Sequence, residues 1–281
     1  MKYTVIFLKA QIMQLITFFA PKGGSGRTTA MMATASGLLS AGHSVAVIDL
    51  TEQVRPGWIF GPSFIRQWED RMLETGAKAD QFVTVPASDY VIASRALSQF
   101  FRDGFEYVLV DTGTHQDLAT IALMNQSDLV IVPMRGPHEA AWSSEWLAKS
   151  RFPKAGTYGL VTGASDHDTG RLARATFTAT PVLHTALPRL DTFDSQVNTG
   201  MLHAQRRFVG EVFNTDQAAC MHVSHDWIAA YSAADALCAE IQCLLKGQKY
   251  PPYTVNTPLA KGHTFAHLQA LYRQPGYERP L

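Results

Sequence analysis

The sequence predicts an α/β fold in which a mostly parallel sheet is flanked by helices. Short apolar runs alternate with helix-like stretches along residues 13–245, which is the order that strand–helix–strand units require. Most of the runs are apolar at every position, as in parallel strands that helices cover on both faces. A glycine-rich segment at 20–29 joins the first run to the first helix-like stretch. The domain therefore begins with a strand–turn–helix unit.

Each expected strand is an apolar run that ends near a polar or turn-forming residue. The strands are expected at 15–19, 45–48, 82–85, 107–110, 129–132, 158–162 and 181–188. The helices are expected at 30–41, 64–73, 88–103, 139–150 and about 217–245, with a short one before 129. Gly42, Gly76 and Gly104 end helices, because glycine readily takes the left-handed conformation that closes one. Ser88 is expected to cap the helix that follows it.

The chain is expected to contain an extension, one large domain and a tail. Residues 1–12 form the N-terminal extension, and Met13 is a candidate natural start. Residues 13–245 form the domain, and 246–281 form a Pro-rich tail that is draped on the domain or partly disordered. Lys9 and Gln11 interrupt the apolar N-terminal run, so we reject a secretory signal there. No stretch is expected to reach the length of a membrane-spanning helix.

The composition is that of a globular protein without an overall charge. The 281 residues carry 24 basic and 24 acidic side chains, which gives a formal net charge of zero. This balance excludes a global attraction to nucleic acid or to an anionic membrane. Cys220, Cys238 and Cys243 are odd in number and lack metal-ligand spacing. We therefore expect reduced thiols and a cytoplasmic protein.

The segment after the first strand has the composition of a phosphate-binding loop. Its expected phosphate-binding residues are Lys22, Gly23, Gly24, Ser25, Gly26, Arg27, Thr28 and Thr29. The glycines let backbone amides approach a phosphate at a helix N-terminus. Thr28 occupies the position whose hydroxyl reaches Mg²⁺ in such loops. The usual pattern has a lysine just before that hydroxyl, where this chain has Arg27.

Two carboxylates follow apolar strands and point to the same site. Asp49 ends the run at 45–48, and Asp111 ends the run at 107–110. Open α/β sheets bind ligands at the carboxyl ends of their strands, so both side chains are expected to lie near the loop. The turn at 111–114 is small enough to respond to a terminal phosphate.

These segments together resemble the ParA/MinD family of deviant Walker A ATPases. Residues 22–29 resemble the motif KGGxGKTT, 45–53 resemble VxxIDxDPQ, 107–112 the Walker B strand, 127–133 the strand after it, and 187–189 a late "IPR" turn. Within the family, the start at 13–18, the stretch 200–203 and Glu52 are most similar to VirC-type homologues of T-DNA and conjugative transfer. The resemblance covers residues 13–245 and implies a P-loop fold.

The resemblance also implies roles for single residues. Lys22 matches the lysine that crosses an ATP-sandwiched homodimer to the partner's nucleotide, and Thr29 matches a contact to the α-phosphate. The implied catalytic set is Lys22, Arg27, Asp49 and Asp111, and the implied metal ligands are Thr28, Asp49 and Asp111. The implied cofactors are ATP or ADP with Mg²⁺.

Two positions depart from the family pattern. Arg27 replaces the lysine that lies against the phosphates, and arginine is planar and fork-shaped. Thr51 replaces the second aspartate of the 45–53 motif, which is expected to position the attacking water. Glu52 is the only neighbouring carboxylate that could take over. We therefore expect ATP binding with weak or absent hydrolysis.

DNA is a second expected partner. Residues 149–207 contain eight basic and four acidic side chains. The candidate contacts to non-specific DNA are Arg171, Arg174, Arg189, Arg206 and Arg207. Such binding would be driven by the phosphate backbone and depend on salt. The alternative interpretation is a solvated helix face.

The resulting hypothesis is a nucleotide-dependent dimeric switch. It would act in plasmid partition, DNA positioning or conjugative transfer, through DNA or a partner protein and without a membrane. It would work in the cytoplasm, with a possible place on the nucleoid. Two alternatives stay open: an active partition ATPase that uses Arg27 in place of the lysine, and a nucleotide-free interaction dimer that has kept the fold.

Overall fold

A computed structural model describes residues 13–51, 64–113, 118–150, 156–200, 202, 225–248 and 250. The chain divides into two compact units, Met1–Lys249 and Tyr250–Leu281. The first unit holds all the strands and helices named below. The expected extension at 1–12 and most of the tail at 246–281 lie outside the described residues, so these boundaries stay predictions.

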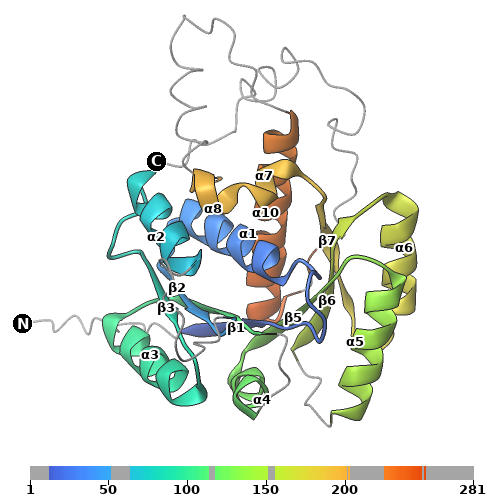
Figure 1. Ribbon diagram of the computed structural model, residues 1–281, viewed down its shortest axis with the longest axis horizontal. Helices are drawn as coiled ribbons and strands as arrows, with labels where there is room; N and C mark the ends of the chain where they lie inside the picture. Colours follow the sequence, from blue (N-terminus) through green and yellow to red (C-terminus); the bar gives the residue numbers. More distant parts are fainter. Residues whose placement is uncertain are drawn as a thin grey trace, which may run out of the picture. The chain divides into compact units, whose positions relative to one another are not determined.

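The core of the first unit is a parallel sheet of seven strands (Figure 1). The strands are β1 (Gln14–Phe18), β2 (Val45–Asp49), β3 (Phe82–Pro86), β4 (Tyr107–Asp111), β5 (Leu129–Met134), β6 (Thr157–Ala164) and β7 (Val182–Pro188). Their order in the sheet is β3-β2-β4-β1-β5-β6-β7, and every recorded pairing is parallel. This arrangement confirms the predicted fold class.

Helices cover both faces of the sheet (Figure 1). They are α1 (Arg27–Ser40), α2 (Phe64–Glu74), α3 (Tyr90–Asp103), α4 (Leu118–Gln126), α5 (Pro137–Lys149), α6 (His167–Thr176), α7 (Asp191–Asp194), α8 (Gln196–Thr199) and α10 (His225–Leu245). Buried residues of α1, α2, α7 and α10 join one hydrophobic cluster, and those of α3, α4, α5 and α6 join two others. The sheet is therefore enclosed on both sides, which explains why its strands are apolar throughout.

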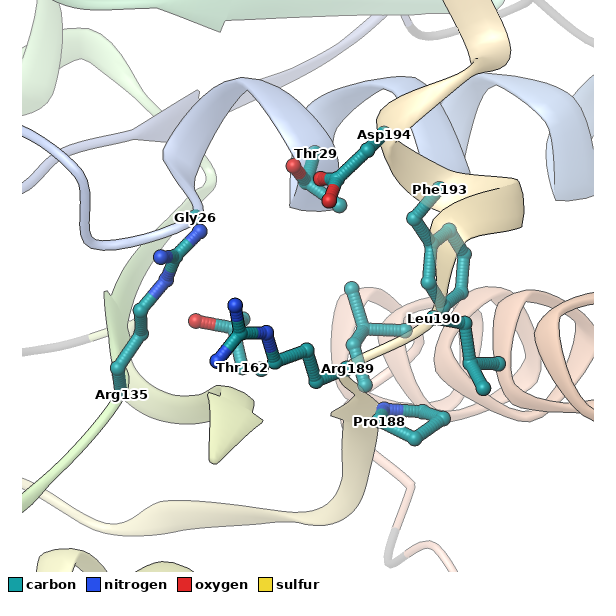
Figure 2. A pocket seen from close by; sticks show the side chains of 11 residues that line it. Gly26, Thr29, Arg135, Thr162, Pro188, Arg189, Leu190, Phe193 and Asp194 are labelled. Carbon is teal, nitrogen blue, oxygen red and sulfur yellow. The ribbon is translucent and has the colours of Figure 1, made fainter. Parts of the chain in front are cut away.

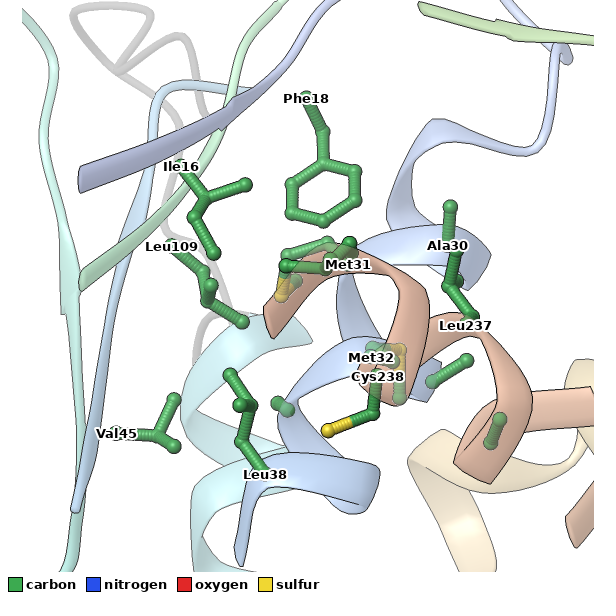
Figure 3. Packing of buried hydrophobic residues seen from close by; sticks show 14 of the residues in the cluster. Ile16, Phe18, Ala30, Met31, Met32, Leu38, Val45, Leu109, Leu237 and Cys238 are labelled. Atoms are coloured by element: carbon green, nitrogen blue, oxygen red, sulfur yellow. The ribbon is translucent and has the colours of Figure 1, made fainter. Parts of the chain in front are cut away.

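Alternate residues of each central strand enter opposite clusters. On β1, Ile16 and Phe18 pack toward α1 and α10, whereas Leu15 packs toward α3. Figure 3 shows the first of these layers, in which Met31 of α1 lies close to Phe18. A Cβ atom at Gly37 would lie 2.7 Å from the Cβ atom of Cys238, so the glycine allows α1 and α10 to pack closely.

One helix boundary differs from the prediction. The cap of α3 is Asp89, whose carboxylate accepts a hydrogen bond from the Ile92 N–H at 2.9 Å. The predicted cap was Ser88, one residue earlier. Gly104 ends the same helix with a φ of 79°, as predicted. The Ser88 hydroxyl instead bonds the Asp89 carboxylate at 3.3 Å.

The helix α10 is long and apolar enough to span a membrane by length and composition. The prediction that no stretch reaches this length was therefore wrong. Its side chains Ala230, Ala234 and Leu237 are fully or almost fully buried, and they belong to the cluster formed with α1 and the sheet. We interpret α10 as a core helix, since its apolar face already has a protein partner.

The edge strand β7 is held by charged side chains from two helices. The buried Glu240 carboxylate on α10 accepts hydrogen bonds from the backbone N–H groups of His184 and Thr185, at 2.7 and 2.8 Å. The Arg174 guanidinium on α6 donates to the carbonyl oxygens of Leu183, His184 and Thr185. Burial lowers the pKa of Arg174, and the charge of Glu240 opposes that shift. These contacts cover polar groups that an edge strand otherwise exposes.

Replacing Glu240 by glutamine is expected to destabilise the protein by about 1–3 kcal/mol, because the amide NH₂ group takes the place of one carboxylate oxygen and leaves one backbone N–H without its acceptor. Chemical denaturation measures this change. Glu74→Gln is the control, since Glu74 is exposed and forms a salt bridge with Arg71 on the same helix; it should leave the unfolding midpoint unchanged. An unchanged midpoint for the Glu240 variant would show that the two hydrogen bonds contribute nothing net.

Candidate functional site

The glycine-rich segment and both predicted carboxylates lie at one edge of the sheet. In the parallel register, Asp111 is paired with Phe18 of β1 on one side and with Asp49 of β2 on the other. The loop that leaves β1 therefore starts beside both carboxylates. Both aspartates are buried, with about 1% of their surface exposed. The structure thus brings together the residues that the sequence placed at strand ends.

The loop is shaped by two glycines and a distant threonine. Gly24 and Gly26 have φ angles of 78° and 85°, which side-chain-bearing residues rarely adopt. The Thr162 hydroxyl at the end of β6 donates to the Ser25 carbonyl oxygen at 2.5 Å. A Cβ atom at Gly26 would lie 2.6 Å from the same hydroxyl oxygen. Thr162 could not be predicted to fix the loop, because nothing in the sequence around it signals the contact.

The helix that follows the loop has an open N-terminus. Gly26 is its cap residue, no described side chain caps it, and its first turn has no acidic residue. The first N–H groups of a helix have no partner within the helix itself, and the helix dipole adds positive potential there. The Ser25 hydroxyl is buried beside it and has no hydrogen-bond partner among the described residues. Together these groups form a cradle for an anion such as phosphate.

The predicted phosphate contact Arg27 takes a different partner in the structure. Its Nε donates to Asp111 Oδ1 at 2.6 Å. Its Nη1 donates to the carbonyl oxygens of Gly113 and Ala20, at 3.2 and 3.4 Å. The guanidinium therefore bridges the loop to the end of β4. This placement explains how the protein accommodates an arginine at a position where the ParA/MinD motif that the sequence resembles has a lysine.

The hydroxyl of Thr28 and the carboxylate of Asp111 are direct neighbours. Thr28 Oγ1 donates to Asp111 Oδ2 at 2.5 Å. Burial raises the pKa of Asp111, while the charge of Arg27 and the hydrogen bonds from Thr28 and Arg27 oppose the shift. A hydroxyl and a carboxylate oxygen are ligands that Mg²⁺ accepts, and the ion takes its other ligands from water and phosphate. These residues therefore fit a nucleotide-bound Mg²⁺.

Asp49 holds the start of the next loop. Its Oδ1 accepts the backbone N–H of Thr51 at 2.8 Å. Thr51 is exposed. Glu52, the carboxylate that could replace the missing aspartate, lies outside the described residues. The structure thus places Asp49 beside the site, and its metal role stays a prediction.

Lys22 is exposed at the tip of the loop and pairs with a residue of its own chain. Its Nζ lies 3.6 Å from Glu139 Oε1 near the start of α5, with 45% of the lysine side chain exposed. Glu139 Oε2 also accepts the backbone N–H of Arg135 at 2.7 Å. A salt bridge at this distance with a half-exposed lysine contributes little to stability. Lys22 is therefore easily released to another partner.

An open pocket lies next to the loop (Figure 2). Its volume is about 420 Å³, counting the solvent at its mouth. Figure 2 shows the Arg135 side chain on the side of the loop and Leu190 and Phe193 on the opposite side, with Arg189 extending from that opposite side toward Thr162. Thr29 of α1 also lines it. An apolar wall with convergent polar groups is the usual form of a small-ligand site.

The candidate DNA-binding arginines differ in their positions and contacts. Arg171 is exposed on α6, 3.5 Å from Asp168, and Arg189 lines the pocket. The Arg174 guanidinium is turned to the carbonyl oxygens of β7, so its expected role in DNA binding is corrected to a structural one. Arg206 and Arg207 lie outside the described residues.

A match to a known protein family covers much of the first half of the chain. Residues 13–137 match the family described as VirC1 protein. This part of the chain is therefore similar to the VirC1 family. The VirC1-type region contains the loop, Asp49 and Asp111 and ends at the start of α5. The pocket residues beyond it, including Arg189, are outside the match.

The curated relatives are two proteins named virC1. The one from Rhizobium radiobacter is 28% identical over 121 residues, and the one from Rhizobium rhizogenes is 30% identical over 122 residues. Each alignment covers 43% of this chain and 48% of the relative. The chain therefore spans about half the length of the curated relatives it matches.

Solved structures show a wider similarity of fold. The MinC:MinD cell division complex of Aquifex aeolicus matches with a TM-score of 0.55 and 13% identity, over 85% of this chain and 97% of that chain. MinD with Mg-ADP from Pyrococcus horikoshii matches with a TM-score of 0.54 and 12% identity, over 85% of this chain and 100% of that chain. At these identities the matches support the fold alone.

Proposed function

We propose that this chain is a nucleotide-dependent dimeric switch that holds ATP with Mg²⁺ and hydrolyses it weakly or not at all. The observation that carries the proposal is the open N-terminus of α1 beside the Thr28–Asp111 pair. The helix supplies N–H groups and dipole potential for the phosphates. Thr28 and Asp111 would hold Mg²⁺, which supplies positive charge to the phosphates.

The pocket beside the loop would take the base and ribose of the nucleotide. Gly26 and Thr29 line the part of the pocket nearest the loop, next to the expected position of the phosphates. Leu190 and Phe193 offer apolar surface for a base, and Arg135 and Arg189 offer hydrogen-bond donors. A nucleotide that extends from the loop to the end of β7 would therefore meet phosphate-binding groups first and base-binding groups last.

Weak hydrolysis would follow from two side chains. Thr51 has no carboxylate to position an attacking water, and Arg27 is bound to Asp111 instead of lying freely in the loop. Phosphoryl transfer depends on water positioning and on charges aimed at the transferring group. Nucleotide binding, rather than hydrolysis, would therefore switch the protein, because the bound nucleotide stabilises the state that encloses it fully.

That enclosed state would be a homodimer in the cytoplasm. Lys22 is exposed and weakly paired, so it can reach the nucleotide of a second copy. The VirC1-type region supports a role in DNA partition, positioning or conjugative transfer. The dimer would act on a partner protein or on the DNA backbone, with Arg171 as an exposed candidate contact.

Sedimentation of the full chain with ATP and MgCl₂ tests the switch, with ATP turnover measured on the same sample. The expected result is a shift from monomer to dimer, and turnover that stays near the background rate. No shift and no binding at millimolar ATP would instead favour the nucleotide-free interaction module. Rapid turnover that is lost in Asp111→Ala would identify an active ATPase.

Replacing Lys22 by glutamine is expected to weaken the nucleotide-dependent dimer at least tenfold, or by about 1.4 kcal/mol, because a charge to the partner's phosphates is lost. Nucleotide binding by one chain should change far less. Sedimentation over a range of protein concentrations measures the dimer constant. Lys149→Gln is the matched control, since Lys149 is exposed and forms a salt bridge with Glu145 on its own helix. Equal dimer dissociation constants for both variants would show that Lys22 does not contribute to the dimer interface.

A further inference from the structure

Asp111, the carboxylate expected to bind Mg²⁺, already forms a salt bridge with the Arg27 guanidinium. We propose that Arg27 is a tethered counter-cation of Asp111 that competes with Mg²⁺, so that nucleotide binding by this chain depends only weakly on the metal. The nucleotide part of this statement rests on the proposed function above. Competition between Arg27 and a divalent cation for Asp111 can be measured without nucleotide.

Both oxygens of the Asp111 carboxylate have a hydrogen-bond donor. Arg27 Nε donates to Oδ1 at 2.6 Å, and Thr28 Oγ1 donates to Oδ2 at 2.5 Å. The two ionic side chains are almost completely enclosed, with 10% of the Arg27 side chain and 2% of the Asp111 side chain exposed. A charged pair at this distance and burial is only weakly screened by solvent and salt. A divalent cation that binds Asp111 therefore has to displace the guanidinium or lie beside its positive charge.

The position of the guanidinium is fixed from three directions. Besides Asp111 on β4, it contacts the carbonyl oxygen of Ala20 after β1 and that of Gly113 after β4. Carbonyl oxygens and a carboxylate are acceptors that suit a guanidinium fork. The contact with Asp111 is thus part of a built site rather than a loose surface pair.

The contact is specific to arginine. The Nε of arginine occupies the place along the side chain where lysine has its Cε methylene. A lysine following the same path would place a methylene against Asp111 Oδ1, and its ammonium would lie further along. The Arg27→Lys variant should therefore remove the donor to Asp111 while keeping a positive charge in the loop.

Arg27 also changes what a nucleotide meets at the loop. Without a counter-charge, the buried Asp111 carboxylate would repel phosphates unless Mg²⁺ neutralised it. Arg27 provides that neutralisation within the chain. ATP is therefore expected to bind almost as well in a chelator as in Mg²⁺, which is the measurable consequence of the tethered cation.

The first experiment measures the affinity for a fluorescent ATP analogue in MgCl₂ and in EDTA. For the native chain the two dissociation constants should agree within about threefold, whereas Arg27→Lys should bind at least tenfold more weakly in EDTA than in MgCl₂. The same ratio for both proteins would overturn the proposal.

The second experiment titrates Mn²⁺, a spectroscopic substitute for Mg²⁺, without nucleotide. Arg27→Lys and Arg27→Met should both bind Mn²⁺ at least about tenfold more tightly than the native chain, because each removes the donor to Asp111. Adding Asp111→Asn to either variant should abolish the gain, which assigns it to this carboxylate. Equal Mn²⁺ affinities in all three proteins would overturn the competition.

The two experiments also separate the inference from the proposed function. If no form of the protein binds the ATP analogue, nucleotide holding is refuted, and the Mn²⁺ titration still decides whether Arg27 competes for Asp111. If Arg27→Met fails to fold, Arg27→Lys alone decides the Mn²⁺ result, since it keeps a positive charge in the loop but lacks the donor to Asp111 Oδ1.

Discussion

Replacing Asp111 by alanine is expected to lower the free energy of unfolding by about 3–5 kcal/mol, because the Arg27 guanidinium is left buried without its carboxylate. The two groups are 2.6 Å apart and 98% of the Asp111 side chain is enclosed, since only 2% is exposed. Denaturant unfolding of the full chain measures the loss. The hydroxyl of Thr28 also loses its acceptor in this variant, which adds to the cost.

A double-mutant cycle separates the ion pair from other effects of truncation. Arg27→Met with Asp111→Asn removes both charges, and the double variant should be more stable than the sum of the single losses predicts by about 1–3 kcal/mol. Asp168→Ala is the surface control, because Asp168 is 79% exposed and lies 3.5 Å from Arg171. Single losses that add without coupling would contradict the buried pair.

Replacing Gly26 by alanine is expected to destabilise the protein by about 1–3 kcal/mol, since the residue adopts a left-handed conformation and its new methyl group meets another side chain. That group would lie 2.6 Å from Thr162 Oγ1. The Thr162 hydroxyl must then leave the Ser25 carbonyl oxygen, which it contacts at 2.5 Å. Nucleotide affinity should fall at least about tenfold because the phosphate cradle is displaced.

Gly24 provides a matched control for this variant. It has a similar φ of 78°, but a Cβ atom there would have nothing within 4 Å. Gly24→Ala therefore tests the backbone conformation without the clash, and it should cost about 1 kcal/mol. Thermal unfolding and titration of the ATP analogue compare the two. Equal losses in both would show that the contact with Thr162 has no effect.

The sheet could be predicted from the sequence because its strands are buried on both faces. Runs such as 45–48 and 107–110 are apolar throughout, and they correspond to β2 and β4. The helix α6 was not predicted, since Ala173 is its one buried residue and few of its ten residues are apolar. Its cap, Asp166, bonds the Thr169 N–H at 2.7 Å, and that local pair was a signal that could have revealed it.

The site could be predicted only in part, because the sequence locates its segments but not the contacts between them. The glycine spacing and the strand ends locate the loop, Asp49 and Asp111, because these follow from chain order and parallel pairing. The partners of long side chains depend on packing among distant segments. The contacts from Arg27 to Asp111 and from Thr162 to Ser25 join residues 84 and 137 positions apart, and no local pattern encodes them.

Calorimetric titration of the full chain with ATP and MgCl₂ tests the central claim most directly, since the proposed switch requires the nucleotide to bind. A P-loop holding site predicts saturable binding of one nucleotide per chain, with a dissociation constant on the order of micromolar, or about −8 kcal/mol. Gly26→Ala should weaken that binding in the same experiment. The absence of saturable binding at millimolar ATP, in a chain shown to be folded, would contradict the claim.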